Sequence, residues 1–444
     1  MDTAKKHRAY VKDPGRVRAL AAAIVDGSLT STALVQACLD RIDAVQPEIE
    51  PWRELDADRA LAVATRRDDE ARKGRPRGLL HGIPVGIKDI IDVAGLPTRC
   101  NSRWRADIAP AIADAEVVAA LKSAGAVVLG KVHTTEYAFF DPSPARNPHN
   151  RDHTPGGSSS GSAAAVASGT VPVTLGTQTM ASVNRPAAYC GIAAFKPSTR
   201  SLSTYGVAPL SILYDTVGFF GWSVDDAVYA YEAAAPAFAA ARGGSTAAGR
   251  ATIVTLDDPL IADADADAAA VFRRIADVLR DAGFPVVSRP APTPFERINA
   301  LHWSTMVYEI ARAHAGLLEL PEDKAVGAKL RQAIEQGLAI PADTYLDERA
   351  ELDRIRGEFF HAFADAGGFL WPAAPGPAPA GLESTGDPKY IAPWTVLGGP
   401  IVTLPAGTTA NGLPLGCILA GRPGRDAEMG ALARRAADAV NAAS

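Results

Sequence analysis

Apolar residues recur at helical spacing through the first part of the chain. Within residues 14–46 the pattern predicts two helices, the first ending at Gly27 and the second capped by Thr30 or Ser31. The Ala-rich, charged segment 56–73 predicts a third helix on the same grounds. The N-terminal part is therefore expected to be helical.

Short apolar runs then alternate with helical segments, and this alternation predicts an α/β sheet. Helices are expected at 114–123, at 223–240 with Ser223 as the cap, over most of 294–366, and from near Asp426 onward. Strands are expected at 83–87, 125–130, 171–176, 251–256, 284–287, 368–371, 401–404 and 415–420. Loops are expected at 141–157 and, as a Gly/Ala/Ser linker, at 240–250.

The segment 294–366 is rich in aromatic residues. It contains Trp303, Met306 and Tyr308 and several phenylalanines, and Trp371 follows shortly after it. Such a helical insert is either ordinary core or one wall of a pocket for an apolar substrate. The sequence favours neither interpretation over the other.

Composition narrows the function class. The chain has 444 residues, which allows two to three domains or one large α/β domain. An apolar fraction of 47% allows a substantial core, and the net charge of -5 is mild. No cluster of lysines and arginines predicts a nucleic-acid surface, and no apolar run is long enough for a membrane span. The polar N-terminus is also unlike a signal peptide.

Neither metal nor disulfide chemistry is expected. The four cysteines fit neither a disulfide framework nor a zinc spacing, so a reduced, cytoplasmic compartment is the simplest expectation. These cysteines are Cys38, Cys100, Cys190 and Cys417. His149 and His153 lie in a Pro/Asn-rich loop, where a surface role is expected. The run ADADADAAA lacks the glycine and glutamate of a calcium loop and predicts an acidic helix start instead.

Residues 155–186 form the most unusual stretch of the chain. The stretch opens with Pro-Gly-Gly followed by Ser158, Ser159 and Ser160, and Ser182 lies near its end. So much small, flexible sequence destabilises a helix or strand. It suits a place where backbone must approach a ligand or where a serine is held in an unusual geometry.

Lys88 stands directly at the end of the predicted strand 83–87. One interpretation is a lysine that snorkels or forms a salt bridge with Asp89 or Asp92. The other is a desolvated lysine whose lowered pKa lets it act as a base. On this segment alone the salt-bridged lysine is the default.

Together these residues suit amide hydrolysis, which needs a nucleophile, a base and donors for the oxyanion. Ser158 and Ser182 are 24 positions apart, and one strand with its flanking turns could bring them together. Lys88 lies 70 positions before Ser158. A Ser–Ser–Lys relay needs only these three groups, because a neutral lysine can accept a proton from one serine through the other.

On the segments GIPVGIKDII, PGGSSSGSAAAVASG, AAYCGIAAFKPS, GGPIVTLPAG and GLPLGCILAG the chain resembles the amidase signature family of serine hydrolases, over nearly its whole length. A Gly/Ser run alone would equally suit a linker or a phosphate cradle, although the Gly-Lys-Ser/Thr of a Walker-type loop is absent. The resemblance implies one large α/β/α domain, with a mixed twisted sheet flanked by helices. This amidase signature domain would span 1–444, with N-terminal helices about 14–73, a catalytic core about 78–240 and a helical substrate-side insert about 294–366.

The resemblance also implies roles for the site residues. Ser182 would be the nucleophile, Ser158 the bridging serine after a cis peptide bond from Gly157, and Lys88 the neutral base. The remaining implied roles are an oxyanion hole built from the backbone N–H groups of Thr179, Met180, Ala181 and Ser182, and orientation of the relay by Ser159 and Thr177.

The chain departs from the family pattern around the nucleophile. Family members usually have two small residues there, most often Gly-Gly or Ala-Gly, whereas this chain has Met180-Ala181. Ala181 is tolerated if its φ is negative and strained if it is positive. Met180 is expected to line the acyl or leaving-group pocket. Asn184 stands where an apolar residue or arginine is common. These changes could reshape specificity, weaken the oxyanion hole, or be engineered.

The leading hypothesis is therefore an amide-bond hydrolase that needs no cofactor and no metal. The triad does not choose among carboxamides, anilides and carbamates (urethanes), but the aromatic region 294–371 favours bulky or aryl substrates, with esters as a side activity. One alternative is an ammonia-donating amidase like the amidase component of an amidotransferase, and another is a non-catalytic relative that binds amides. The expected partner is a small-molecule amide or carbamate, with no nucleic acid and no membrane; a homodimer is left open.

Overall fold

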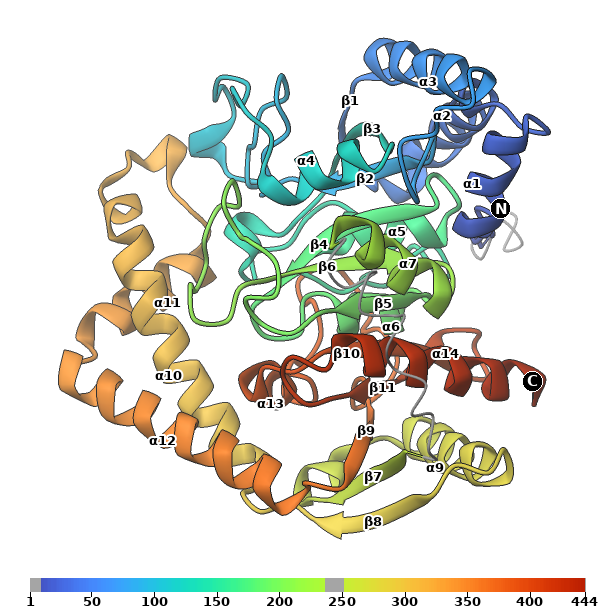
Figure 1. Cartoon of the computed structure of the whole chain (residues 1–444). Coiled ribbons are helices and arrows are strands. Elements are labelled where there is room, and N and C mark those ends of the chain that lie inside the picture. The colour runs from blue at the N-terminus through green and yellow to red at the C-terminus, as the bar shows by residue number, and fades with distance from the viewer. Residues whose placement is uncertain (1–8, 236–250, 444) are drawn as a thin grey trace, which may run out of the picture.

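The computed structural model describes residues 9–235 and 251–443, which fold as a single domain around one 11-stranded sheet. The strand order is β1-β3-β2-β4-β6-β5-β10-β11-β9-β7-β8, and the strands follow this order from top to bottom in Figure 1. The strands are β1 Trp52–Leu55, β2 Pro84–Lys88, β3 Val127–Val132, β4 Val173–Gln178, β5 Ala193–Lys196, β6 Thr216–Gly221, β7 Thr252–Asp257, β8 Val286–Pro290, β9 Ala366–Pro372, β10 Ile401–Thr408 and β11 Pro414–Ala420.

Helices flank the sheet, as the resemblance implied. They are α1 Val17–Asp26, α2 Ser31–Ile49, α3 Ala57–Arg72, α4 Glu116–Ser123, α5 Ser160–Ala167, α6 Asn184–Tyr189, α7 Val224–Ala234, α9 Ala266–Asp281, α10 Phe295–His314, α11 Ala328–Ala339, α12 Ala342–Ala362, α13 Ala392–Leu397 and α14 Asp426–Ala442. The expected α/β class with a mixed, helix-flanked sheet is confirmed.

The sheet is mixed in strand direction. β2 pairs in parallel with β3 and β4, and β7 pairs in parallel with β8 and β9. The other pairs are antiparallel. Because parallel strands end at the same edge of a sheet, the end of β2 at Lys88 lies close to the end of β4 at Thr177 and Gln178.

Buried side chains form two separate cores on the two faces of the sheet. Phe195 of β5 faces Phe219 of β6 and belongs to one core. The neighbouring pair, Ala194 and Phe220, belongs to the other. Successive strand residues point to opposite faces, so a strand with both faces covered is apolar throughout.

This double burial explains the strands that sequence analysis missed, namely β1, β5 and β6. β5 and β6 are buried at every position, so neither shows the alternation of apolar and polar residues that marks a half-exposed strand. β1 has only four residues, WREL, and directly precedes a helix. Short segments of this kind carry too little periodicity to be recognised from sequence.

The segment 294–366 is helical, as expected, and its helices α10, α11 and α12 lie together along one side of the sheet (Figure 1). Two acidic residues attach α11 to the sheet domain. The carboxylate of Asp141 accepts the backbone N–H groups of Lys329 and Leu330, and Glu136 accepts that of Gly327. These N–H groups lie at the start of α11, where the helix dipole favours negative charge.

Two local expectations about helix starts are confirmed. Ser223 caps α7 in a capping box with Asp226. Asp265, within the ADADADAAA run, caps α9 by accepting the N–H of Ala268. The helix expected over 223–240 is present as α7, which ends at Ala234. The last part of that range and the linker expected at 240–250 lie outside the described residues.

His149 and His153 correct one expectation, because they are not simply surface residues. Each is partly buried, and a ring nitrogen lies 3.0 Å from the carbonyl oxygen of Cys190 and 2.8 Å from that of Ala378, respectively. They tie the loop 141–157 to segments far away in sequence, which a loop without secondary structure needs to stay ordered.

Three general features of the described chain bear on function. The four cysteines are free and buried. Over residues 9–235 and 251–443 no group of three or more His, Cys, Asp and Glu side chains is arranged to hold a metal ion. Within the same residues, no helix combines the length and apolarity needed to cross a membrane.

Candidate active site

Lys88 is the last residue of β2 and is completely buried. Its Nζ lies 2.7 Å from Oγ of Ser158 and 2.8 Å from Oγ1 of Thr177. Thr177 belongs to β4, the parallel neighbour of β2, and Ser158 lies just before α5. The strand pairing thus brings together polar groups that are up to 89 positions apart in the sequence.

The carboxylates near Lys88 in the sequence do not pair with it. Asp89 forms a buried ion pair with Lys131, with 3.0 Å between oxygen and nitrogen. Asp92 accepts a hydrogen bond from Oγ1 of Thr98. Because successive side chains of an extended backbone point in opposite directions, Asp89 faces away from Lys88. The salt-bridge interpretation of Lys88 therefore does not hold.

Burial without a carboxylate partner lowers the pKa of Lys88 to about 7, although Asp215 and Cys100 act in the opposite direction. A substantial fraction of this side chain is then uncharged at neutral pH, and a neutral amine has a lone pair that can accept a proton. The environment therefore gives Lys88 the protonation state that a general base needs.

Ser158 follows a cis peptide bond from Gly157, as the resemblance implied. The carbonyl oxygen of Gly157 accepts a hydrogen bond of 2.8 Å from the buried guanidinium of Arg185. A Cβ atom at Gly157 would lie 2.7 Å from the side chain of Thr385, closer than van der Waals contact allows. Only glycine fits here, and Arg185 holds the peptide that precedes Ser158.

Ser159 connects this loop to β4. Its Oγ donates to the carbonyl oxygen of Thr177 and accepts the N–H of the same residue, both at 3.2 Å. Because Oγ1 of Thr177 contacts Lys88, these bonds fix the backbone of a residue that holds the lysine in place. Ser159 and Thr177 thus have the contacts that orientation of a relay requires.

Ser182 lies in the turn 179–182, which connects β4 to α6. The side-chain oxygen of Gln178, the last residue of β4, accepts the backbone N–H groups of Val183 at 2.9 Å and Asn184 at 3.1 Å. This amide therefore satisfies donors at the start of α6 that have no partner within the helix. It also fixes the direction in which the turn delivers Ser182.

Two side chains from distant segments fix carbonyl groups of the same turn. Nε2 of His302 in α10 lies 3.0 Å from the carbonyl oxygen of Thr179. Oγ1 of Thr395 in α13 donates to the carbonyl oxygen of Met180 at 2.6 Å. Because C=O and N–H point in opposite directions across a planar trans peptide, these bonds also set the direction of the N–H groups of Met180 and Ala181.

The N–H groups of Met180, Ala181 and Ser182 have no acceptor in the described part of the chain. Adjacent unpaired donors beside a nucleophile are the arrangement that stabilises an oxyanion. None of the three residues has a left-handed backbone, so alanine occupies position 181 without the strain that a positive φ would cause.

Ser158 and Ser182 line one narrow cavity, and Met180 lines it too, as sequence analysis expected. The other lining residues are Ala138, Phe139, Phe140, Thr179, Arg185, Leu210, Met306 and Pro388. The volume of about 10 Å³ leaves room for roughly one water molecule. The larger part of a substrate must therefore lie outside this cavity.

A wider space of about 260 Å³, here called the aromatic vestibule, shares Phe139 and Phe140 with the narrow cavity. It is lined by Phe139, Phe140, Trp303, Lys329, Gln332, Ala333, Gln336, Ser384 and Thr385. The rings of Phe139 and Phe140 are 4.7 Å apart, and both lie within 6.4 Å of the Trp303 ring. Trp303 is 37% exposed, so a large aromatic surface remains open to a ligand.

The aromatic residues of the insert therefore divide between the two interpretations. Trp303 and Met306 line the vestibule and the narrow cavity, respectively. Trp371 is completely buried in the core, and Tyr308 stacks on Tyr345 at 4.1 Å. Helical spacing alone does not distinguish these faces, because all of these side chains belong to apolar stretches.

Backbone strain is concentrated beside the cavity. Tyr137 and Ala138 have φ values of 45° and 62°, in the left-handed region that residues other than glycine rarely adopt. This turn directly precedes Phe139 and Phe140, which line both spaces. Strain of this kind persists only where the surroundings enforce it, often at functional sites.

Asn184 departs from the family pattern without entering the cavity. It is completely buried in α6, and its Nδ2 donates to Oγ1 of Thr403 at 3.0 Å and to the carbonyl oxygen of Ile401 at 3.3 Å. The asparagine thus ties the helix after Ser182 to β10, and its effect on the site is through packing.

Sequence analysis did not identify four residues that support the site: Arg185, Asp215, His302 and Thr395. His302 and Thr395 are 123 and 215 positions away from the carbonyl groups that they contact. Asp215 accepts a hydrogen bond of 2.5 Å from Oγ1 of Thr179, and burial raises its pKa to about 6. No local pattern marks these residues, because their partners are brought to them only by folding.

Comparisons with known proteins agree with this geometry. The family model described as Amidase matches residues 33–429. A curated relative, the amidase component of the glutamyl-tRNA(Gln) amidotransferase of Rhodopirellula baltica, is 32% identical, and the match covers 88% of this chain and 90% of the relative. Among solved structures, a crystal structure of an amidase has a TM-score of 0.84 at 30% identity, covering 95% of this chain and 99% of that one. The native peptide amidase of Stenotrophomonas maltophilia has a TM-score of 0.79 at 27% identity, covering 96% and 97%.

Proposed function

The chain belongs to the amidase family and is an amidase-signature serine hydrolase of C–N bonds; from this premise, we propose that it cleaves bulky aryl amides and aryl carbamates through a Ser182 acyl-enzyme. The observation that carries the assignment is the contact of 2.7 Å between Nζ of the buried Lys88 and Oγ of Ser158, beside a cavity that Ser158 and Ser182 share.

In the proposed mechanism Lys88 is the base and Ser158 passes protons between it and Ser182. Ser182 attacks the substrate carbonyl as its proton moves to Ser158 and the proton of Ser158 moves to Lys88. The developing oxyanion is bound by the N–H groups of the turn 179–182. The leaving amine takes its proton from Ser158, and water then hydrolyses the acyl-enzyme by the same relay.

The substrate class follows from the aromatic vestibule. The narrow cavity holds only the reacting carbonyl, so the adjoining group of the substrate lies against Phe139, Phe140 and Trp303. Among the lining residues of both spaces the only charged side chains are Arg185 and Lys329, and both already donate to backbone carbonyl oxygens. An uncharged aromatic group matches these walls.

The relatives named as amidotransferase components support a second candidate function, the release of ammonia from a glutamine-like amide, together with the protein partner that such a complex implies. Against it stands the lining of both spaces, which contains no carboxylate. A free amino acid carries an ammonium group, and a buried ammonium needs a counterion or hydrogen-bond acceptors. The aryl substrate therefore remains our first proposal, and a homodimer remains a prediction.

The experiment that tests the proposal compares an anilide, an aryl carbamate and an aryl ester with glutamine, each with the same purified protein. We expect hydrolysis of the anilide or the carbamate, faster hydrolysis of the ester because its leaving group is better, and no ammonia release from glutamine. Ammonia release from glutamine without turnover of any aryl substrate would replace our first proposal with the second.

Replacement of Trp303 by alanine is expected to raise KM for an aryl carbamate by about tenfold, because an exposed aromatic wall contributes roughly 1 to 1.5 kcal/mol to stacking. The KM for a short aliphatic amide should change little, since its acyl group does not reach the vestibule. Steady-state kinetics with both substrates measures the difference.

Trp104→Ala is the matched control, because Trp104 is also a partly exposed tryptophan but lines neither space. Equal effects of Trp303→Ala on both substrates would mean that the vestibule does not select aryl groups.

A further inference from the structure

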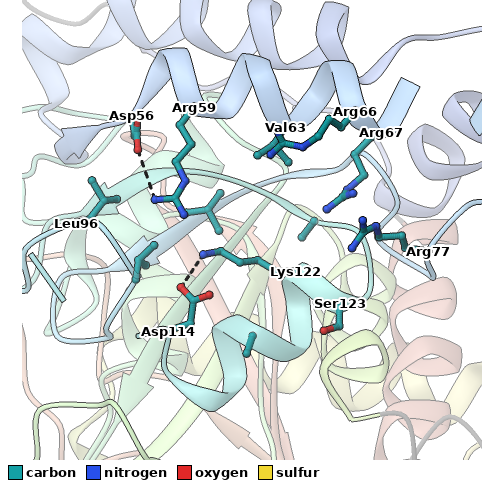
Figure 2. Close-up of a pocket in the computed structure, with 14 residues that line it drawn as sticks. Asp56, Arg59, Val63, Arg66, Arg67, Arg77, Leu96, Asp114, Lys122 and Ser123 are labelled. Atoms are coloured by element: carbon teal, nitrogen blue, oxygen red, sulfur yellow. Dashed lines mark hydrogen bonds and ion pairs between the residues drawn. The ribbon is translucent and has the colours of Figure 1, made fainter. Parts of the chain in front are cut away.

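A second cavity, here called the cationic groove, lies between α3 and α4 and has a volume of about 390 Å³ (Figure 2). It is lined by Asp56, Arg59, Val63, Arg66, Arg67, Arg77, Val93, Leu96, Asp114, Ala119, Lys122, Ser123, Ala126 and Val128. None of these residues lines the narrow cavity or the aromatic vestibule. The proposed catalytic mechanism therefore does not account for it.

The groove is built by the regular spacing of two helices. Arg59, Val63 and Arg66 follow one another at intervals of four and three residues along α3, so they share one face of that helix. Lys122 and Ser123 belong to α4, on the opposite wall. The lining between the walls includes small and apolar side chains, so the groove has charged walls and a largely apolar interior.

Positive charge is in excess at this groove. Five lining residues are cationic and two are acidic, although the protein as a whole has a net charge of -5. Lys122 forms an ion pair with Asp114 at 2.6 Å. Arg59 lies 3.9 Å from Asp56, near the limit for an ion pair, and donates to a backbone carbonyl.

The other three cations have only one carboxylate among them. Arg67 and Arg77 both pair with Glu70, at 2.7 and 2.6 Å. The exposed Arg66 has no partner among the described residues. Burial lowers the pKa of Arg67, and the positive charges of Arg77 and Arg66 act in the same direction against the opposing effect of Glu70. An additional anion would relieve this repulsion.

The cations occupy two ends of the groove. In Figure 2, Arg59 and Lys122 extend toward each other from opposite helices, while Arg67 and Arg77 lie together further along α3. Arg59 and Arg67 are eight residues apart in one helix, which places their Cα atoms about 12 Å apart. Val63 lies between them on the same helix.

We propose that the cationic groove is a second, non-catalytic binding site for a small organic dianion, with anionic oxygens at both ends of an apolar body. Arginine side chains bind carboxylate and phosphate oxygens with paired hydrogen bonds, so either group fits the two ends. The apolar interior favours a hydrocarbon body over a compact inorganic ion, and a length that spans both ends favours a dianion over a monoanion.

The test is calorimetric titration of the full chain at constant ionic strength with two series of ligands. One series runs from malonate to suberate, and the other from methylenebisphosphonate to hexamethylenebisphosphonate, with hexanoate as the monoanion. We expect saturable binding of one dianion per chain that tightens with length in at least one series, and the stronger series identifies carboxylate or phosphate as the preferred group. Binding that does not saturate, or that does not depend on length, would overturn the proposal.

Variants place the binding in the groove. Arg66→Gln and Arg59→Gln are each expected to weaken binding by about tenfold, the effect of losing one hydrogen bond to a charged group. Arg72→Gln is the matched control on the same helix, because Arg72 is 73% exposed and lies outside the groove. Glutamine is a good helix former, so α3 should stay folded. Equal binding by the parent and both groove variants would refute the site. Ser182→Ala should bind the dianion unchanged, which separates this test from that of the proposed function.

Discussion

Replacement of Ser182 by alanine is expected to lower kcat for every substrate that the parent cleaves by about 10⁴-fold or more, because no acyl-enzyme can form without the nucleophile. The oxyanion donors of the turn 179–182 come from the backbone and remain in place. Substrate binding should therefore change much less than turnover. Steady-state kinetics on the best aryl substrate, together with mass spectrometry after treatment with a serine-reactive fluorophosphonate, measures both effects.

The control comes from the same serine-rich stretch. Ser160 is buried at the start of α5, and its hydroxyl lies 2.6 Å from that of Ser143 rather than next to Lys88. Ser160→Ala should keep most of the activity and all of the labelling, and Ser182→Ala should lose both. A parent protein that binds aryl amides but neither turns over nor takes up the label would favour the non-catalytic, amide-binding alternative.

Replacement of Lys88 by methionine is expected to lower kcat by about 10³-fold, the upper range of what general base catalysis contributes. Methionine is similar in length and uncharged, so the buried site can still pack around it. In the parent, the neutral form of Lys88 is the active one. Its population rises as the pH passes upward through a pKa of about 7, so activity should rise about tenfold per pH unit below that value and level off above it.

Lys196 is a matched control for this prediction. It is also completely buried, and burial also lowers its pKa to about 7, but its Nζ donates to the carbonyl oxygens of Pro197 and Gly399. Lys196→Met should keep the pH profile even if it lowers the melting temperature. A parent profile that is flat between roughly pH 6 and 9, or one that Lys196→Met abolishes, would count against Lys88 as the base.

The proposal for the substrate rests on a contact between segments that sequence analysis considered separately. The helical insert was expected either to fill the core or to form a pocket wall, and its residues do both. Trp303 reaches Phe139 and Phe140, which follow the strained turn at Tyr137 and Ala138. Nothing in the periodicity of α10 indicates which of its aromatic residues meets that turn.

Much of the local structure could be predicted because it depends on neighbours in the sequence. Gly27 ends α1 in a left-handed conformation, Thr30 caps α2, and Ser223 caps α7. These features need only a few adjacent residues and the backbone donors at a helix end. The strands β5 and β6 escaped prediction for the opposite reason, since full burial on both faces removes the alternation that identifies a strand.

The sequence by itself determined the family, the class of fold and the identity of the three candidate catalytic residues, because the serine-rich stretch and the strand before Lys88 carry them in short, specific segments. Only the tertiary structure decided what those residues contact. Asp89 follows Lys88 directly, yet it pairs with Lys131, and Lys88 instead contacts Ser158, 70 positions later. The physical reason is that strand pairing and burial, rather than distance along the chain, decide which polar groups meet and which charges remain unpaired.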